Sequence, residues 1–206
     1  KPDYSGVTLY KKKYLKIKKK NQYGLVDLSG KSILPVVADA FKLENGLMFY
    51  LKGVLWGAVT LEGKALILPN YSAYALLNPS LIKLERFGEN WLFNIPEQKI
   101  VSTKSARDFL PFSDKYVLTR LGDKFGLVDY QSTEILANKY QEIQSFSTVA
   151  FRVRNGWKWG LVHKNGQQLL DYQYDFIAPI RNGKALVKKG AFFGLIDEDG
   201  QIIVPV

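Results

Sequence analysis

The stretch WGLVHKNG, residues 159–166, decides the fold because its pattern returns along the chain at a nearly constant spacing. An aromatic residue and a glycine come first, two small or aliphatic residues follow, and a polar turn closes the stretch. The glycines that follow an aromatic residue in this pattern are Gly24, Gly57, Gly126, Gly160 and Gly194. Their spacings are 33, 69, 34 and 34 residues, and the long gap holds a further copy at Trp91-Leu92, where leucine replaces the glycine. The chain therefore reads as six tandem repeats of about 34 residues.

Each repeat carries the signals of three short strands. The segment before the aromatic residue alternates apolar and charged side chains, as in Phe151-Arg152-Val153-Arg154, which indicates a strand with one buried face. The aromatic-Gly segment gives a second strand, and a turn with Asp and Gly then reverses the chain. A short apolar strand follows and often ends in proline, as in Ile33-Leu34-Pro35. We predict an all-β fold of three-stranded units, joined by linkers with anchors such as Phe41 and Tyr74.

The predicted architecture is one repeat domain over residues 1–206. A single unit is too small to bury a core, so neighbouring units must stack. We expect the aromatic residue before each glycine to fill the space between units, with ligand binding as the alternative, and the glycine to allow close backbone approach or a β-bulge. A curved, open, solenoid-like array is expected, and a closed, propeller-like ring is the alternative, although a propeller blade has four strands. The predicted units are residues 12–44, 45–79, 80–113, 114–147, 148–181 and 182–206.

The order of these features is similar to the bacterial WG β-repeat family, also described as KWG-type repeats. The third unit departs most from it, because Leu92 replaces the glycine and Pro96-Glu97 interrupts the turn. The resemblance implies a bacterial tandem-repeat protein, of a kind often exported or found at the cell surface, without a shared enzymatic activity or catalytic residue set. The best matching segments are Trp159-Gly160-Leu161-Val162, Tyr174-Asp175-Phe176-Ile177 and Phe193-Gly194-Leu195-Ile196-Asp197.

Composition limits the classes of function. The chain has 206 residues, a formal net charge of +10 and no cysteine. The charge favours anionic partners, although it also promotes solubility. No apolar run approaches the roughly 18 residues of a membrane-spanning helix, so we predict a soluble chain with no membrane span. Because the first residue is Lys1, we expect that the chain was processed, and either a removed signal peptide or a cloned fragment would explain it.

We predict no catalytic residues, no metal site and no cofactor. His163 is the single histidine, and it takes the turn position that Asp fills in other repeats, so we expect it to cap a turn. A catalytic triad or a zinc site needs further His or Cys partners, which the sequence lacks. An enzyme would instead need a pocket of carboxylates from the irregular third unit, around Glu85, Glu89 and Asp108.

Binding residues are expected where the repeats differ from one another. At the turn before the aromatic-Gly pair, Trp157 and Phe192 stand where other units carry mostly polar residues. If neighbouring units present these turns on one edge, the rings and nearby basic side chains form a patch suited to an acidic peptide or glycan. The alternative is that both rings cover neighbouring apolar surface. The predicted binding residues are Trp157, Phe192, Arg152, Arg154, Arg181, Lys188 and Lys189.

Residues 11–20 form a second basic segment with the sequence KKKYLKIKKK. As a site for nucleic acid or anionic lipid, it would act by charge, and its binding would fall steeply with salt. We favour the alternative that these lysines protect an exposed edge strand from pairing with another chain.

The sequence therefore predicts a non-catalytic binding or scaffold protein, exported to the periplasm or cell surface of a bacterium. Its expected partner is a protein or an anionic envelope polymer. An anionic-polymer or nucleic-acid binder that uses the basic patches is the alternative, with nucleic acid the less favoured partner. The oligomeric state is left open.

Overall fold

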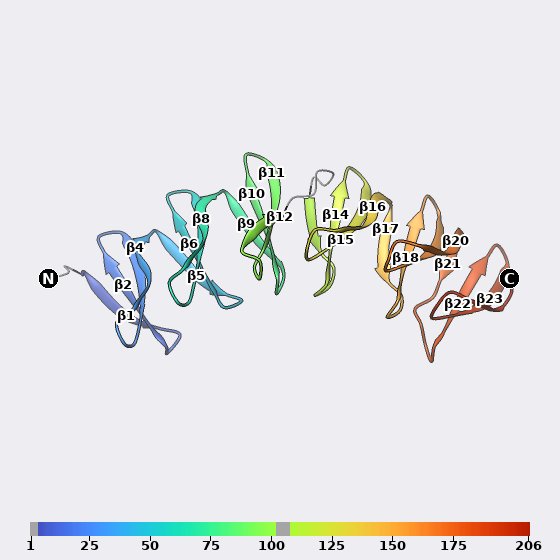
Figure 1. Ribbon diagram of the computed structural model, residues 1–206, viewed down its shortest axis with the longest axis horizontal. Coiled ribbons are helices and arrows are strands. Elements are labelled where there is room, and N and C mark those ends of the chain that lie inside the picture. The colour runs from blue at the N-terminus through green and yellow to red at the C-terminus, as the bar shows by residue number, and fades with distance from the viewer. Residues whose placement is uncertain (1–3, 102–107) are drawn as a thin grey trace. The chain divides into compact units, whose positions relative to one another are not determined.

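The computed structural model describes residues 4–101 and 108–206, which form strands and turns without a helix. The chain makes two compact units, Lys1–Ile100 and Val101–Val206. The described strands form six separate four-stranded antiparallel sheets (Figure 1). The predicted all-β repeat fold is therefore confirmed. No helix in the described ranges has the length and hydrophobicity needed to cross a membrane.

Each sheet contains four strands that are consecutive in the chain. The strands of the first three sheets are β1 (Gly6–Tyr10), β2 (Tyr14–Lys19), β3 (Gln22–Asp27), β4 (Ser32–Ala38), β5 (Ala40–Glu44), β6 (Leu47–Lys52), β7 (Leu55–Thr60), β8 (Ala65–Tyr71), β9 (Ala73–Asn78), β10 (Leu81–Arg86), β11 (Glu89–Asn94) and β12 (Lys99–Val101). The strands of the last three sheets are β13 (Asp108–Pro111), β14 (Tyr116–Leu121), β15 (Lys124–Asp129), β16 (Glu134–Tyr140), β17 (Glu142–Ser145), β18 (Ala150–Asn155), β19 (Lys158–His163), β20 (Gln168–Tyr174), β21 (Phe176–Ile177), β22 (Lys184–Lys189), β23 (Phe192–Asp197) and β24 (Ile202–Val204).

The prediction of three strands per unit is wrong, because the expected linker contains the first strand of the next sheet. One residue, Asp39, separates β4 from β5, and β5 pairs with β6 rather than with the sheet before it. Phe41, which was expected as a linker anchor, lies in β5 and pairs with Tyr50. Each sheet after the first thus begins within the preceding sequence repeat. Residues 102–107 of the predicted third unit lie outside the described residues.

The hydrophobic core lies between neighbouring sheets. A buried Leu or Phe side chain is worth about 1.5–3 kcal/mol relative to an exposed one, so stacking supplies stability that a single sheet lacks. In the first unit, the first and second sheets share Leu25, Leu34, Met48 and Val59, and the second and third share Phe49, Ile67, Ile82 and Phe93. In the second unit, the fourth and fifth sheets share Leu127, Tyr140, Phe151 and Val162, and the fifth and sixth share Leu161, Tyr174, Val187 and Ile196.

The glycine lies opposite a β-bulge in four of the five aromatic-Gly pairs, at Gly24, Gly57, Gly126 and Gly160. Phe125 pairs with Tyr140 and Leu127 pairs with Leu136, so β16 carries extra residues opposite the glycine between them. A Cβ atom at Gly126 would lie 2.6 Å from the carbonyl oxygen of Leu136, which is closer than side chains are found. The expected close backbone approach is confirmed. In the other repeats, the equivalent backbone carbonyl oxygen lies 2.5–2.9 Å from a Cβ atom built at Gly24, Gly57, Gly160 and Gly194.

The polar residue at the start of each turn caps it. The Asp129 carboxylate accepts hydrogen bonds from two backbone N–H groups of its turn, at 2.9 and 2.8 Å. Asp27 and Asp197 do the same. In the fifth repeat, His163 Nδ1 accepts a hydrogen bond from the backbone N–H of Asn165 at 3.1 Å. The predicted capping role of His163 is therefore confirmed, because a ring nitrogen replaces the carboxylate oxygen.

Candidate interaction site

Trp157 and Phe192 lie at the tips of equivalent hairpins in the fifth and sixth sheets. Trp157 follows Gly156 in the turn between β18 and β19, and its side chain is 88% exposed. Phe192 is the first residue of β23, next to the turn at Gly190, and it is 70% exposed. The alternative that both rings cover apolar surface is wrong for Trp157, because nearly all of its side chain faces solvent.

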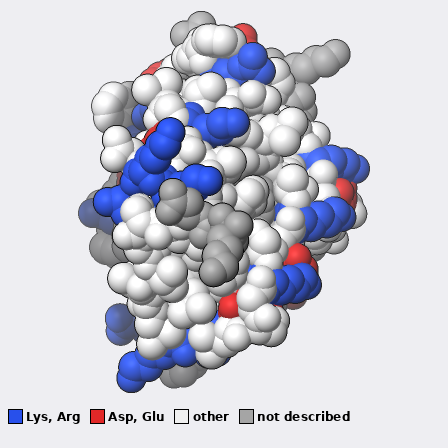
Figure 2. All heavy atoms as spheres, turned by 90° about the vertical axis from the view of Figure 1, so that its left-hand side faces the viewer, with Lys and Arg blue, Asp and Glu red and all other residues white. Residues whose placement is uncertain are grey.

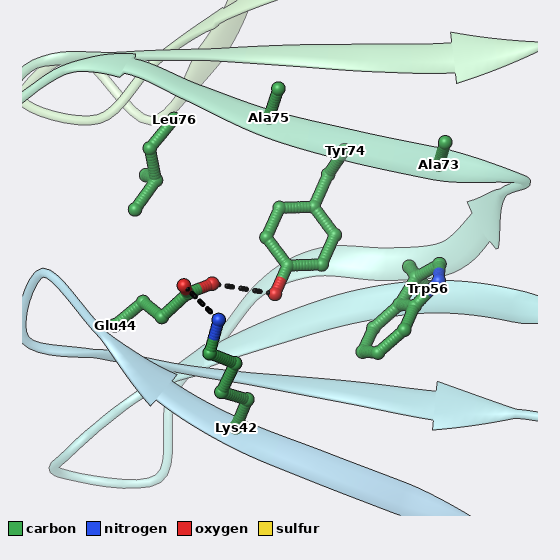
Figure 3. A pocket seen from close by; sticks show the side chains of 7 residues that line it. All are labelled: Lys42, Glu44, Trp56, Ala73, Tyr74, Ala75 and Leu76. Carbon is green, nitrogen blue, oxygen red and sulfur yellow. Dashed lines mark hydrogen bonds and ion pairs between the residues drawn. The ribbon is translucent and has the colours of Figure 1, made fainter.

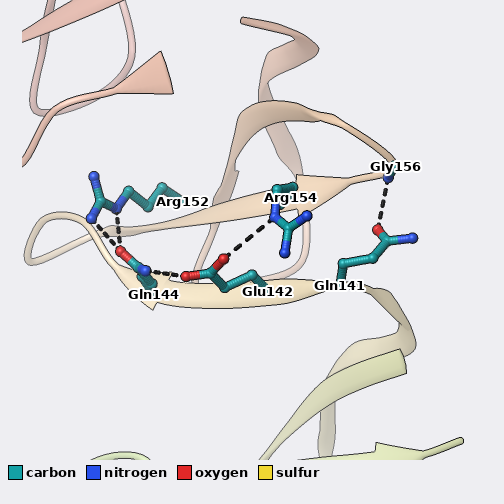
Figure 4. A network of polar contacts seen from close by, with 6 residues as sticks. All are labelled: Gln141, Glu142, Gln144, Arg152, Arg154 and Gly156. Carbon is teal, nitrogen blue, oxygen red and sulfur yellow. Dashed lines mark hydrogen bonds and ion pairs between the residues drawn. The ribbon is translucent and has the colours of Figure 1, made fainter. Parts of the chain in front are cut away.

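Side chains from the segments between sheets hold these turns in place. The N–H of Gly156 donates to Gln141 Oε1 at 2.7 Å (Figure 4). The N–H of Gly190 donates to Asp175 Oδ2 at 2.6 Å. In the second sheet, Asp39 accepts from Gly53 in the same way, at 2.6 Å. The residue that precedes each of these sheets therefore fixes the hairpin turn of that sheet.

Asp175 also joins the two hairpin tips. Its Oδ1 atom lies 2.5 Å from the ammonium of Lys158, the residue after Trp157, while its Oδ2 atom accepts from Gly190. The pKa of Asp175 lies below its ordinary value, mainly because of the hydrogen bond from Lys158 and secondly because of the hydrogen bond from Gly190. This carboxylate therefore stays charged near neutral pH. We call residues 156–158 and 190–193 the paired hairpin tips, because one carboxylate connects them.

Comparison of the six repeats with one another did not identify Asp175 or Lys158 as part of this site. The signal for Asp175 was present in the Tyr174-Asp175-Phe176-Ile177 segment, where an Asp between two strands has a turn within reach. Lys158 gives no such signal, since a lysine in an exposed turn is common.

Two of the three predicted arginines, Arg152 and Arg154, make contacts with groups of the sheets. The Arg152 guanidinium donates to Gln144 and to the backbone carbonyl of Ile177 in the sixth sheet. Arg154 pairs with Glu142 at 3.3 Å (Figure 4). Burial lowers the pKa of the Arg152 guanidinium. Arg152 therefore joins two sheets, rather than presenting its charge to solvent.

The remaining predicted residues fall at two ends of one strand. Lys188 and Lys189 end β22 beside the paired hairpin tips, where Lys189 donates to Gln173 at 2.7 Å and Lys188 lies 5.5 Å from the centre of the Phe193 ring. Arg181 precedes the start of β22, so it lies about 20 Å from Lys189 at the usual rise per residue. The structure brings Lys188 and Lys189 to the aromatic tips and separates Arg181 from them.

The basic segment at residues 11–20 does not form one patch. Strand β2 crosses the first sheet, so Lys11 and Lys20 lie at its two ends, about 20 Å apart. Lys16, between them, lies 3.8 Å from the centre of the Tyr23 ring. Figure 2 shows Lys and Arg atoms in several separate groups on the face it displays. The edge-protection interpretation is also wrong, because β2 pairs with both β1 and β3 and is not an edge strand.

The carboxylates considered for catalysis are placed as follows. Glu85 lines a cleft of about 190 Å³ beside Lys83. Asp108 forms an ion pair with Arg120 at 3.0 Å. Glu89 begins β11 and is exposed. Within residues 4–101 and 108–206, no three His, Asp or Glu side chains are grouped in a way that could hold a metal ion.

Residues 159–191 match the family model described as "WG containing repeat", which confirms the predicted resemblance to WG β-repeats. No curated protein matches the sequence. Among solved structures, Hsv2 of Kluyveromyces lactis with its complete loop 6CD is 10% identical, with 79% of this chain and 60% of that chain covered and a TM-score of 0.37. A second Hsv2 structure from that organism is also 10% identical, with 98% and 84% covered and a TM-score of 0.38. The extracellular domain of a one-component system from B. thetaiotaomicron is 9% identical, with 98% and 35% covered and a TM-score of 0.32.

Proposed function

We propose that this chain, with its WG repeat at residues 159–191, is a non-catalytic scaffold that binds a protein partner through the paired hairpin tips. The observation that supports this most is the 88% exposure of Trp157 on a turn fixed by Gln141. An exposed tryptophan buries about 150–250 Å² when a partner covers it. Its few rotatable bonds make that burial cheap in conformational entropy, which is why aromatic residues dominate binding hot spots.

The charges around the paired hairpin tips favour an acidic partner. Lys189 donates to an uncharged amide, so the positive charge of its ammonium is not neutralised by that contact. The net charge of +10 adds a long-range attraction for acidic peptides and anionic envelope polymers. We propose an acidic protein or envelope polymer as the partner, and the periplasm or surface of a bacterium as the location. The WG resemblance is the support for that location.

The test is capture of partners from a bacterial envelope extract by immobilised protein. We expect Trp157→Ala and Phe192→Ala to reduce capture of the bound partner by about tenfold or more, as for hot-spot residues. Their melting temperatures should stay close to that of the unmodified protein, because both side chains are exposed. Phe87→Ala is the matched control, since Phe87 is 89% exposed at the equivalent turn of the third sheet. Unchanged capture by both tip variants would contradict the proposal.

An anionic-polymer or nucleic-acid binder is the second candidate, and the net charge of +10 supports it. Such binding releases counterions and therefore weakens steeply as salt rises. A salt titration with DNA, RNA and an acidic glycan tests it, and absence of affinity at low salt would remove it.

A further inference from the structure

The third sheet has an unprotected edge. Strand β9 is the terminal strand of that sheet and pairs with β10 alone among the described strands. Its sequence, AYALLN, contains neither a charged residue nor a proline. Edge strands usually carry such residues because they prevent pairing with another chain. The first strands of three other sheets do carry them: Lys42 and Glu44 in β5, Asp108 and Pro111 in β13, and Glu142 in β17. The first strands β1 and β21 carry neither, but β21 has only two residues.

Two clefts flank β9 on opposite faces. The larger, of about 540 Å³, lies on the side of Tyr74 and Leu76, between this strand and the second sheet (Figure 3). The smaller, of about 190 Å³, borders Lys83 and Glu85. Tyr74 pairs with Leu84, and paired residues have their side chains on the same face of the sheet. Residues 83 and 85, which line the smaller cleft, therefore have their side chains on the opposite face, so the two clefts open on opposite faces. Both clefts border the same three residues, 73–75.

The larger cleft has aromatic walls and a fixed polar end. Tyr74 stacks on Phe49 with ring centres 4.0 Å apart, and Trp56 meets it edge-on at 5.1 Å. The Tyr74 hydroxyl donates to Glu44 at 2.8 Å, and Lys42 lies 2.5 Å from the other oxygen of that carboxylate (Figure 3). Burial, reinforced by Glu44, raises the pKa of Tyr74, so the hydroxyl remains a donor. The walls therefore suit a large apolar or aromatic side chain.

We propose that the edge of β9 binds an extended peptide by strand addition, with an aromatic side chain of the peptide in the Trp56–Tyr74 cleft. Successive side chains of an added strand alternate between faces, which matches two clefts on opposite sides of one edge strand. The small side chains of Ala73 and Ala75, on the other face from Tyr74, leave room for side chains of the added strand (Figure 3). This site lies in the first compact unit and does not depend on the paired hairpin tips.

The test uses fluorescein-labelled nine-residue peptides of alternating threonine and serine, with a central Phe, Tyr, Trp or Lys. Anisotropy titration with the whole chain should show at least tenfold tighter binding of an aromatic peptide than of the Lys peptide. Two N-methylated forms of the best peptide separate strand addition from simple burial of a ring. Methylation of one alternating set of amides should abolish binding, while methylation of the other set should not, because only alternate N–H groups face β9.

Protein variants complete the test. Trp56→Ala should weaken binding of the aromatic peptide at least tenfold, and Ala75→Arg, which places a charge on the edge strand, should weaken it without lowering the melting temperature. Trp157→Ala should leave it unchanged, so failure of this site is distinguishable from failure of the proposed function. The proposal is overturned if no peptide binds at concentrations up to about 1 mM, or if the two methylated forms bind alike.

Discussion

The glycine beneath the bulge is the position where one added atom has the clearest consequence. A Cβ at Gly126 would meet the Leu136 carbonyl oxygen at 2.6 Å and the Asn138 nitrogen at 2.9 Å. Because both are backbone atoms of β16, that strand has to shift to admit a methyl group. We expect Gly126→Ala to lower the free energy of unfolding by about 1–3 kcal/mol, the usual cost of overpacking. Urea denaturation measures this loss.

Gly6→Ala provides the control for that substitution. A Cβ at Gly6 would lie 3.7 Å from Lys18 Cβ, which is an ordinary contact. The free energy of unfolding should then change by no more than about 0.5 kcal/mol. If both variants lose the same stability, the close approach of β16 does not explain why the position is glycine.

Comparison of repeats predicted single residues well where the backbone imposes the same need on each copy. The roles of Gly126 and His163 could be predicted because other repeats fill the same positions with glycine or a turn-capping side chain. Comparison of the repeats could not predict the role of Leu92, which replaces the glycine in the third repeat. That residue is fully buried, although the other repeats carry glycine at this position.

Two arginines of one strand have different roles at the scale of the sheets. Arg152 donates across to Ile177 in the sixth sheet, whereas Arg154 pairs with Glu142 of its own sheet. We expect Arg152→Ala to cost about 1.5–3 kcal/mol, because it removes a charged donor between sheets. Arg154→Ala should cost less than about 1 kcal/mol, because its ion pair with Glu142 is only partly buried and remains accessible to solvent. Thermal unfolding of both variants measures the difference, and equal losses would contradict the bridging role of Arg152.

The first strand of each sheet shows why sequence alone underestimated the number of strands. Strands β17 and β21 have four and two residues, so each offers one buried apolar side chain and is too short for an alternating pattern. What defines them is backbone pairing with the following hairpin. The acceptor that meets Arg152 likewise comes from β21, so its engagement could not be predicted from the pattern of β18.

At the scale of the whole molecule, the sequence predicted stacked repeats but not their division into two compact units. The boundary, between Ile100 and Val101, falls in the third sheet. That sheet contains the repeat that departs most from the pattern, at Leu92 and Pro96-Glu97. The irregularity was visible, although nothing in it indicated a boundary, because compactness depends on contacts between sheets rather than on the pattern within one.

Cores shared by neighbouring sheets should make stability local. Phe49 is 1% exposed and belongs to the core shared by the second and third sheets. Phe49→Ala should remove about 3–5 kcal/mol from the stability of that region, the usual cost of a large cavity. Amide hydrogen exchange should then quicken in β5–β10, while protection in β17–β24 stays as it was.

Phe151 offers the matched change in the second unit, since it is also 1% exposed and lies in the core shared by the fourth and fifth sheets. Phe151→Ala should quicken exchange in β15–β20 and leave β1–β8 protected. The pair of variants therefore tests both directions at once, because each unit serves as the reference for the other. Equal loss of protection along the whole chain in either variant would mean that the two units unfold as one cooperative body, and stability could not be treated as a sum over neighbouring sheets.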